Sequence, residues 1–487
     1  MNDGRETFVL TQPLRPGPRP IDTLNNVAEY HVENFGCRAS RADGEAIAAN
    51  LRQHGLMPGE TSASAHVVIV NTCSVTAEAD RQARAWIRRV RRQNPAARVI
   101  VTGCYAQRAP EELAVLPGVD AVVGNSHKSL VPEVALRVLA QKQEPNRVED
   151  PGLPSPDPAF VPLGRILHDD AFAHTELASL AFAPDARQIR PNLKVQDGCG
   201  NRCSFCIIPT TRGPSRSVPL AVCLDNVLRF VDCGGTELVL SGINLGRWGR
   251  DLAPVRRFEE LVAAILTQTA LPRLRLSSIE PMDWSADLLD LYRGFSAGEH
   301  ARLAGHAHLP LQSGSDTILR RMYRRYRPWH YAERLAQIHC FLPHAAIGAD
   351  VMIGFPGETE ALFQESHDFI AAQPFTYLHL FPFSPRPGTP AWELHRQDPV
   401  ASRAVQERMA ALRSLIAEKS RSFRSRFLGR TLSAVTVEAG ADGATEAVTE
   451  NFLKLTLAPQ KAQSIPANRL VTAHITHLTP EGLAGTT

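Results

Sequence analysis

The chain has 487 residues, 44% of them hydrophobic and 21% charged, with a formal net charge of +3. This length predicts two to four domains, and the small charge excess does not by itself indicate a polyanion partner. No apolar run reaches the ~18–20 residues of a membrane span, and the N-terminus has no signal-peptide core. We therefore expect a cytoplasmic protein with no membrane segment. Nine cysteines in such a chain favour metal ligands and buried thiols over disulfides.

The first 140 residues divide into a tail and an α/β region. Residues 1–28 contain several prolines and no hydrophobic periodicity, which predicts a disordered tail. In residues 29–140, strand-like and helix-like patterns alternate, which indicates an open parallel sheet with helices on both faces. The expected strands cover 30–37, 66–73, 97–104 and 119–125, and the expected helices 43–55 and 78–94.

The rest of the chain predicts a linker and two further domains. Residues 141–190 are rich in proline and predict a linker with one short packed segment at 177–182. Residues 191–425 predict five or six β/α units, which fit a full or partial (β/α) barrel with its chemistry at the strand C-termini. Residues 426–487 predict a small all-β barrel. The expected strands of the central barrel cover 192–199, 236–243, 273–280, 305–312, 346–356 and 376–384.

Three cysteines, here called the loop triplet, lie within eight residues after the first of these strands: Cys199, Cys203 and Cys206. Their C-x-x-x-C-x-x-C pattern is one ligand short of filling a 4Fe–4S cluster, so one iron would stay open to a small molecule. Structural zinc is an alternative, but it usually recruits four ligands. Core thiols are another, which the neighbouring glycines, asparagine and arginines disfavour. We therefore predict a cluster with an open iron.

Three more cysteines, here called the N-terminal triplet, each follow a predicted strand of the first α/β region: Cys37, Cys73 and Cys104. The carboxyl ends of parallel strands converge on one crevice, where three thiolates would hold a second cluster with an open iron. The alternative is that each is a small buried hydrophobe. We expect core packing for the remaining cysteines, Cys223, Cys233 and Cys340.

Polar residues gather at the predicted C-termini of the barrel strands, in the motifs LSGINLG, SSIEP, HLPLQSGS and DVMIGFPGET. Glycines there let the backbone approach a ligand, while carboxylates and amides can bind a ribose or an amino-acid head group. Ordinary loop chemistry is the alternative, since Gly, Ser and Pro are common turn residues. As a ring around the loop triplet, these motifs predict a cofactor pocket formed by Gly242, Asn244, Glu280, His308, Gln312, Ser313 and Asp350.

Two basic segments are candidates for RNA contact. One predicted helix carries six arginines around Trp86, namely Arg81, Arg84, Arg88, Arg89, Arg91 and Arg92. The C-terminal barrel carries Phe452 as a candidate stacking surface, together with Lys454, Lys461 and Arg469. Phosphate neutralisation needs such clusters, but a solvated basic face is the commoner explanation. Neither segment identifies RNA by itself.

The loop triplet, with Phe205 before its last cysteine, resembles the cluster-binding loop of radical S-adenosylmethionine enzymes. With the N-terminal triplet and the C-terminal barrel, it makes the chain from about residue 30 to its end similar to the methylthiotransferases, whose last domain is a TRAM-type RNA-binding barrel. The segments QDGCGNRCSFCIIP, RGPSRS, ELVLSGINLGRWGRD, FPFSPRPGT and TENFLKL most resemble the bacterial members that act on threonylcarbamoyladenosine in tRNA.

The resemblance implies that the loop triplet binds a 4Fe–4S cluster whose open iron chelates S-adenosylmethionine. One-electron cleavage then releases a 5′-deoxyadenosyl radical that removes hydrogen from carbon 2 of the modified adenine at tRNA position 37. The N-terminal triplet would hold a second 4Fe–4S cluster that carries the sulfur, methylated by a second S-adenosylmethionine. The implied partners are the tRNA anticodon loop, an electron-donating reductase or flavodoxin-like protein, and a sulfur donor.

Other readings stay open within and outside this class. Related enzymes act on isopentenyladenosine in tRNA or on a ribosomal-protein aspartate, and a non-catalytic iron–sulfur protein that binds RNA is a more remote alternative. A structural cluster needs neither an open iron nor a cofactor pocket, which disfavours the last. The chain also departs from the family pattern, with 38–40 reading Arg-Ala-Ser instead of Lys, an aliphatic residue and Asn. Asp43 stands at the place of an acid, while Gly200 and Phe383 replace a frequent Asn and Tyr.

Overall fold

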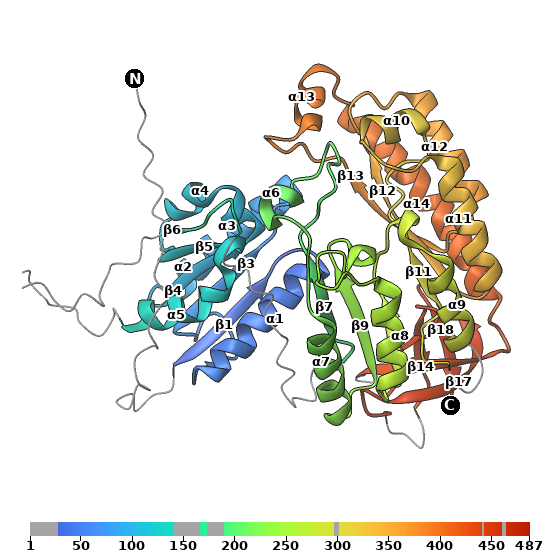
Figure 1. Ribbon diagram of the computed structural model, residues 1–487, viewed down its shortest axis with the longest axis horizontal. Helices are drawn as coiled ribbons and strands as arrows, with labels where there is room; N and C mark the ends of the chain where they lie inside the picture. The colour runs from blue at the N-terminus through green and yellow to red at the C-terminus, as the bar shows by residue number, and fades with distance from the viewer. Residues whose placement is uncertain (1–27, 141–165, 173–188, 297–300, 441–442, 460–463) are drawn as a thin grey trace, which may run out of the picture.

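The computed structural model describes residues 28–140, 166–172, 189–296, 301–440, 443–459 and 464–487. The predicted tail up to residue 27, the packed segment at 177–182 and Lys461 lie outside the described residues. Figure 1 shows an N-terminal parallel sheet beside a partial barrel, with a small β-barrel against the lower end of the latter. No helix in the described part of the chain is both long enough and apolar enough to cross a membrane.

The N-terminal part is a parallel sheet between two layers of helices. Its strands are β1 (Glu29–Asn34), β2 (Met57–Pro58), β3 (Val67–Thr72), β4 (Arg98–Gly103), β5 (Ala121–Gly124) and β6 (Ile166–Leu167). Its helices are α1 (Arg38–Gln53), α2 (Ala77–Gln93), α3 (Cys104–Arg108), α4 (Pro110–Ala114), the 3-10 helix η1 (Asn125–Leu130) and α5 (Val131–Ala140).

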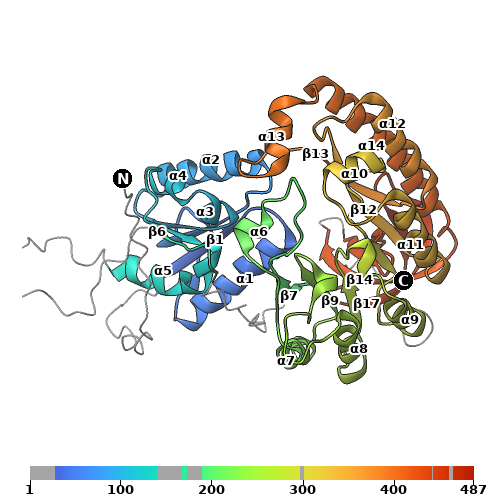
Figure 2. The same ribbon diagram turned by 45° about the horizontal axis from the view of Figure 1, so that its top comes forward.

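The strand order is β2-β1-β3-β4-β5-β6, and every pairing is parallel. Helices α1 and α5 cover one face of this sheet, and α2, α3 and α4 cover the other (Figure 2). Strand β3 is buried on both faces, which explains its unbroken apolar run VVIV. The predicted open parallel sheet is therefore confirmed.

Three short features of this part differ from the sequence prediction. Helix α1 begins at Arg38, directly after Cys37, and not at Asp43, because Ala39 and Ala42 extend its buried face. Strands β2 and β6 were not expected, since two residues are too few for a visible alternation. Strand β6 lies inside the expected linker and pairs with β5, so this stretch of the linker packs as a sheet edge.

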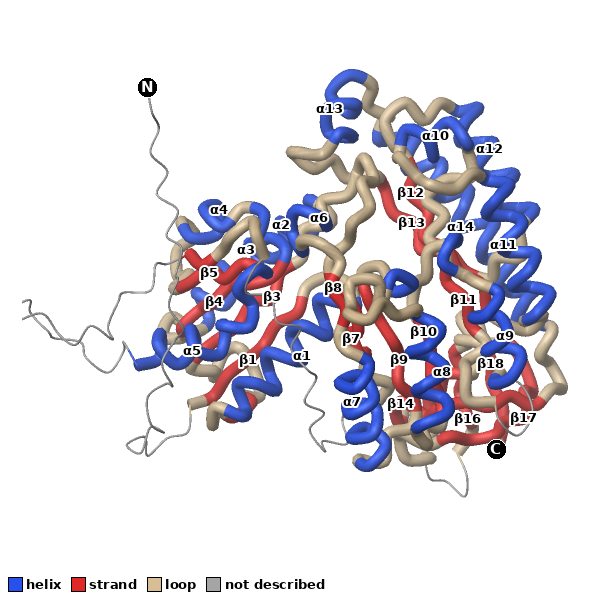
Figure 3. The backbone as a smooth tube through the Cα atoms, in the orientation of Figure 1, coloured by secondary structure: helices blue, strands red, loops and turns tan. Residues whose placement is uncertain are grey.

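The central part is a partial barrel of parallel strands with helices outside (Figure 3). Its strands are β7 (Asn192–Asp197), β8 (Arg216–Ser217), β9 (Glu237–Gly242), β10 (Arg273–Leu276), β11 (His306–His308), β12 (Ala346–Ile353) and β13 (Tyr377–Pro382). Its helices are α6 (Ile208–Arg212), α7 (Leu220–Asp232), η3 (Leu245–Arg247), α8 (Phe258–Gln268), η4 (Pro281–Asp283), α9 (Ala286–Phe295), α10 (Asp316–Arg321), α11 (Pro328–Phe341), α12 (Glu360–Ala372), α13 (Pro390–Gln397) and α14 (Ser402–Ser425).

The central strands form two sheets, β10-β9-β7-β8 and β11-β12-β13, and a parallel bridge between Leu274 and Leu303 connects them. Only β8 among these strands pairs antiparallel, so the strands from β7 to β13 otherwise run in one direction. The predicted partial (β/α) barrel is confirmed, and its strand C-termini share one end.

The C-terminal part is a closed β-barrel in the order β14-β15-β16-β18-β17, as predicted. Its strands are β14 (Thr431–Ala439), β15 (Thr445–Thr449), β16 (Lys454–Leu457), β17 (Leu470–Leu478) and β18 (Leu483–Thr486). Its contact with the central barrel includes apolar packing and a buried polar part. Arg275 donates to the carbonyl oxygens of Thr449 at 3.0 Å and Glu450 at 3.1 Å, and its other donors pair with Glu237 at 2.8 Å.

Candidate functional site

The loop triplet lies between β7 and α6, at the C-terminal end of the first barrel strand. Gly198 has a φ of +73°, and a Cβ there would lie 1.9 Å from the carbonyl oxygen of Pro214, so only glycine fits this turn. Backbone bonds from Cys199 to Gly213 (3.1 Å) and from Ser204 to Met322 (3.1 Å) fix the loop. The three cysteines are half-buried.

Hydrogen-bond donors surround the sulfurs of the loop triplet. Arg324 Nη1 donates to Cys203 Sγ at 3.2 Å, and Asn244 Nδ2 donates to Cys199 Sγ at 3.7 Å. Burial raises the pKa of Cys206 to about 12, so its thiolate needs a cation such as iron for compensation. Donors aimed at sulfur stabilise negative charge there, as a cluster ligand requires.

The N-terminal triplet gathers at the C-terminal edge of the parallel sheet. Cys73 follows β3, Cys104 follows β4, and Cys37 precedes α1. Burial, with further contributions from Cys104 and Cys37, raises the pKa of Cys73 to about 12, so the three thiols are neighbours. Gly36 has a φ of +103°, and a Cβ there would lie 2.7 Å from Cys73 Sγ. The chain thus brings together three thiols that are 67 residues apart in sequence, from Cys37 to Cys104.

Each sulfur of the N-terminal triplet also has a hydrogen-bond partner. Asn125 Nδ2 donates to Cys104 Sγ at 3.4 Å, the Val75 amide donates to Cys73 Sγ at 3.5 Å, and Ser40 Oγ lies 3.7 Å from Cys37 Sγ. The same Asn125 amide donates to the carbonyl oxygen of Thr211 at 2.8 Å, in the helix that follows the loop triplet. One side chain therefore connects the two cysteine sites.

A buried charge cluster joins the N-terminal sheet to the central barrel; its members are Asp43, Lys128, Lys194, Asp197 and Arg212. Arg212 Nη1 lies 3.0 Å from Asp43 and 2.9 Å from Asp197. Burial alone would raise the pKa of Asp43, but Lys128, Lys194 and Arg212 lower it to about 2. Burial would lower the pKa of Arg212, but Cys104, Asp197, Asp43 and Cys37 raise it above its usual value. Arg212 therefore lies near the N-terminal triplet, and its own helix follows the loop triplet.

The predicted pocket residues lie at the strand ends beside the loop triplet. Four buried polar atoms there have no hydrogen-bond partner among the described residues: Ser241 Oγ, Asn244 Oδ1, His308 Nε2 and Gln312 Oε1. Buried polar atoms are nearly always paired, so these atoms are available to a polar ligand. Gln312 has a φ of +67°, a strained conformation that is common at ligand sites.

The other predicted pocket residues have partners within the protein. Glu280 pairs with Arg324, the residue that also binds Cys203 Sγ. The hydroxyl of Ser313 lies 2.9 Å from that of Ser366 in α12, so it serves packing of this helix. Asp350 Oδ1 lies 3.2 Å from His379 Nδ1 on the neighbouring strand. Gly242 is half-buried beside the side chain of Gln196.

Comparison with known proteins decides the family. Residues 193–370 match the model of the Radical SAM superfamily, and residues 29–124 match Uncharacterized protein family UPF0004. The chain is 33% identical, over 88% of its length and 90% of the relative's, to the threonylcarbamoyladenosine tRNA methylthiotransferase MtaB of Bacillus subtilis. It is 31% identical, over 84% of its length and 78% of the relative's, to the tRNA-2-methylthio-N(6)-dimethylallyladenosine synthase of a Parafrankia strain. The chain belongs to the radical S-adenosylmethionine methylthiotransferases.

The fold of this methylthiotransferase also matches a solved radical enzyme. The radical S-adenosylmethionine methyltransferase TsrM of Kitasatospora setae, solved with cobalamin and a 4Fe–4S cluster bound, superposes with a TM-score of 0.51. That match covers 76% of this chain and 78% of the other at 15% identity, so it supports the fold alone. The predicted enzyme class is confirmed, and membership of the superfamily implies S-adenosylmethionine and a 4Fe–4S cluster.

Three residues that contact the predicted site residues were not predicted from the sequence. Arg324 follows α10 in the basic run RRMYRRYR, which has no motif of its own. Asn125 is the last residue of a predicted strand. The strand before it ends at Cys104, and this adjacency was the signal that could have placed Asn125 at the N-terminal triplet. His379 alternates with Tyr377 along β13. All three act through contacts between distant segments, which spacing along the chain does not show.

Two predictions about other residues are wrong or altered. Cys223 is buried as expected, but Cys233 and Cys340 are exposed, because each lies at the solvent side of its helix end. Phe452 is half-buried against His306, with ring centres 4.6 Å apart.

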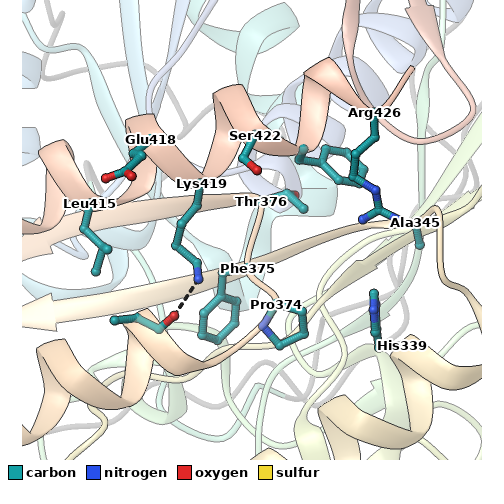
Figure 4. A pocket seen from close by; sticks show the side chains of 12 residues that line it. His339, Ala345, Pro374, Phe375, Thr376, Leu415, Glu418, Lys419, Ser422 and Arg426 are labelled. Atoms are coloured by element: carbon teal, nitrogen blue, oxygen red, sulfur yellow. Dashed lines mark hydrogen bonds between the residues drawn. The ribbon is translucent and has the colours of Figure 1, made fainter. Parts of the chain in front are cut away.

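A separate pocket of about 450 Å³ lies between α14 and the chain leading into β13 (Figure 4). Lys419 of α14 and Arg426, which directly follows that helix, face His339 and Phe375 across it. Lys419 Nζ donates to the carbonyl oxygen of Ala371 at 2.7 Å. None of the predicted site residues lines this pocket. It is therefore distinct from the cysteine sites of the methylthiotransferase.

Proposed function

We propose that the protein inserts a methylthio group at carbon 2 of N6-threonylcarbamoyladenosine at position 37 of tRNA. The observation that carries this proposal is the pairing of two cysteine triplets, each supplied with donors to its sulfurs and joined by Asn125 and Arg212. A methylthio transfer needs a centre that breaks a C–H bond and a centre that delivers sulfur. The names of the relatives at 33% identity support threonylcarbamoyladenosine as the substrate.

The residues divide the work between the two sites. We assign the radical cluster to the loop triplet and a sulfur-carrying 4Fe–4S cluster to the N-terminal triplet. When bound, the radical cluster with S-adenosylmethionine supplies the one-electron chemistry that breaks an unactivated C–H bond. Arg324 and Asn244 hold the loop sulfurs, while the unpaired atoms of Ser241 and Gln312 would bind the cofactor. A second S-adenosylmethionine would provide the methyl group.

The same proposal assigns the parts of the chain and their partners. Residues 29–140 would form the sulfur-carrying domain, 191–425 the radical domain and 426–487 a TRAM-type RNA-binding domain. The tRNA anticodon loop would be the substrate, with a flavodoxin-like or other reductase as electron source and a separate sulfur donor. The exposed arginines of α2, the helix that follows Cys73, would supply cations for the tRNA backbone.

Anaerobic reconstitution tests the two-cluster assignment. The wild-type protein should bind roughly eight irons per chain and release 5′-deoxyadenosine from S-adenosylmethionine on reduction. Replacing the N-terminal triplet by serines should leave roughly four irons and this release, whereas the same change in the loop triplet should abolish it. The exposed Cys233→Ser and Cys340→Ser variants are controls that should keep all irons. Four irons in the wild-type protein would refute the assignment.

The nucleoside composition of tRNA from a deletion strain tests the substrate. Loss of the methylthio form of threonylcarbamoyladenosine, restored by the wild-type chain, is the expected result. Loss of the methylthio form of isopentenyladenosine instead would establish the alternative substrate. Unchanged tRNA nucleosides would direct the search to a ribosomal-protein aspartate.

A further inference from the structure

Arg38 is a cation without a matching anion. It is the first residue of α1 and directly follows Cys37 of the N-terminal triplet. Its side chain is exposed, and in the part of the chain that the structure describes it makes no hydrogen bond or ion pair. Its guanidinium lies 6.0 Å from the centre of the Phe452 ring, which belongs to the C-terminal barrel. An arginine in this position keeps all its N–H donors available for a ligand.

The charged groups around Arg38 are already paired with others. Asp350, which attracts Arg38 across this junction, lies 3.2 Å from His379 Nδ1, within hydrogen-bond distance. Arg190 and Arg275, the cations that repel Arg38 across this junction, both pair with the buried carboxylate of Glu237 at 2.8 Å. These neighbouring charges are therefore engaged with others, and Arg38 has no ion-pair partner among the described residues.

Arg38 also lies where three parts of the chain meet. It comes from the helix beside the N-terminal triplet, while Phe452 packs against Tyr377 of the central barrel with ring centres 5.7 Å apart. His308 and Asp350, on the strands that carry the predicted pocket, face the same junction. We call the group formed by Arg38, His308, Asp350, His379 and Phe452 the Arg38 patch. A base held at this patch would lie beside the proposed sulfur-carrying site.

We propose that Arg38 binds the carboxylate of the threonyl group and thereby selects threonylcarbamoyladenosine. This inference rests on the proposed function and names the residue that recognises the substrate of the proposed reaction. The guanidinium is a planar fork that binds a carboxylate through two parallel hydrogen bonds. An isopentenyl group has no charge and would leave this cation desolvated and unpaired, which disfavours that substrate. Arg38 is a specificity-determining residue in this scheme.

Binding of anticodon stem-loops to the anaerobically reconstituted protein tests the inference. Three loops differ only at position 37, which carries threonylcarbamoyladenosine, its neutral threonine amide, or plain adenosine. Wild-type protein should bind the acid about 10- to 100-fold more tightly than the amide, the range of a charge-assisted hydrogen bond. Arg38→Gln should bind acid and amide equally, and Arg38→Lys should keep part of the preference. Arg41→Gln, an exposed change one turn along α1, should keep all of it.

The possible outcomes separate this inference from the proposed function. Equal weakening of all three loops by Arg38→Gln would overturn the inference and indicate a phosphate contact. Wild-type protein that does not distinguish acid from amide, yet forms the methylthio product on threonylcarbamoyladenosine, would also overturn it while the function stands. Failure to form that product would refute the function itself. The iron content of each variant shows whether a loss of stem-loop binding comes from a damaged cluster site.

Discussion

The Asp43 carboxylate accepts a hydrogen bond from Arg212 Nη1 at 3.0 Å. Asp43 belongs to the helix that follows Cys37, and Arg212 to the helix that follows Cys206, so this contact connects the chain segments of both triplets. Two carboxylates and three cations meet here, all of them buried. The relative position of the two cysteine sites therefore depends on charge balance at this cluster.

Asp43→Asn should destabilise the iron-free protein by about 3–5 kcal/mol, because it removes one of two anions facing three buried cations. Urea unfolding measures this loss. The matched control is Glu407→Gln, which removes an exposed partner of Arg403 and should cost less than about 1 kcal/mol. A loss of the same size in both variants would contradict the role assigned to the charge cluster.

Gly36→Ala should remove the iron of the N-terminal triplet and leave that of the loop triplet. A Cβ at this position would lie 2.7 Å from Cys73 Sγ, and φ is +103°. Iron content should therefore fall from roughly eight to roughly four per chain, with release of 5′-deoxyadenosine retained. Gly200→Ala is the control inside the loop triplet, because nothing lies within 4 Å of its Cβ. Full iron content in Gly36→Ala would be evidence against the N-terminal site.

Arg324→Met should lower the reduction potential of the radical cluster, because a cationic donor to Cys203 Sγ stabilises the more negative reduced state. A difference of about 1 kcal/mol corresponds to about 40 mV for one electron. Redox titration monitored by electron paramagnetic resonance measures it. Arg320→Met, an exposed change on α10, should leave the potential unchanged. A potential that rises in Arg324→Met would be inconsistent with this contact.

Acid should weaken the contact between the central and C-terminal barrels through Glu237. Burial would raise its pKa, but Arg275, Arg190 and Arg273 lower it to about 2 from 4.5. Since the folded pKa lies below the unfolded one, the contribution is complete above pH 4.5 and is lost as the pH falls toward 2. This pKa difference corresponds to about 3 kcal/mol. The unfolding free energy of Glu237→Gln should therefore fall less steeply between pH 5 and pH 3 than that of the wild-type protein.

Charge reversal on α2 should weaken the binding of all tRNAs, whatever their nucleotide sequence. Arg88, Arg89 and Arg92 are exposed, whereas Arg84 donates to the Tyr105 hydroxyl and Arg91 to the carbonyl oxygen of Pro95. Changing the three exposed residues to Glu should lower the slope of log affinity against log salt by about 2–3. The same reversal at Arg293 of α9 is the control. An unchanged salt slope would rule out the α2 surface.

Much of this architecture follows from the sequence, because apolar periodicity reports directly on burial. The unbroken VVIV of β3 and the short alternating strands after residue 430 identified a parallel sheet and a β-barrel. The six cysteines of the two triplets were also visible, since each lies in a compact motif or at a strand end. An edge strand of two residues, such as β6, is too short to show a periodic pattern. It forms because it pairs with the neighbouring strand β5.

The polar contacts of the site were not predictable in the same way. Arg324 reaches Cys203 from 121 residues away, and Arg212 reaches Asp43 from 169 residues away. Such pairs depend on how two sheets pack against each other, and the spacing of residues along the sequence does not show this packing. Phe452 shows the opposite error, because an exposed-looking turn aromatic is in fact packed against His306.

The packing of Phe452 and Arg275 determines how separable the C-terminal barrel is. Phe452 fills a space against His306 and Tyr377, while Arg275 crosses the boundary to bind two carbonyl oxygens of the turn that carries it. In a chimera that exchanged the C-terminal barrel for that of a relative, the new turn would have to match Arg275 of the central barrel, or Arg275 would have to be exchanged with it. The last sixty residues are thus built into the catalytic barrel, and modular exchange at residue 426 would break one continuous interior.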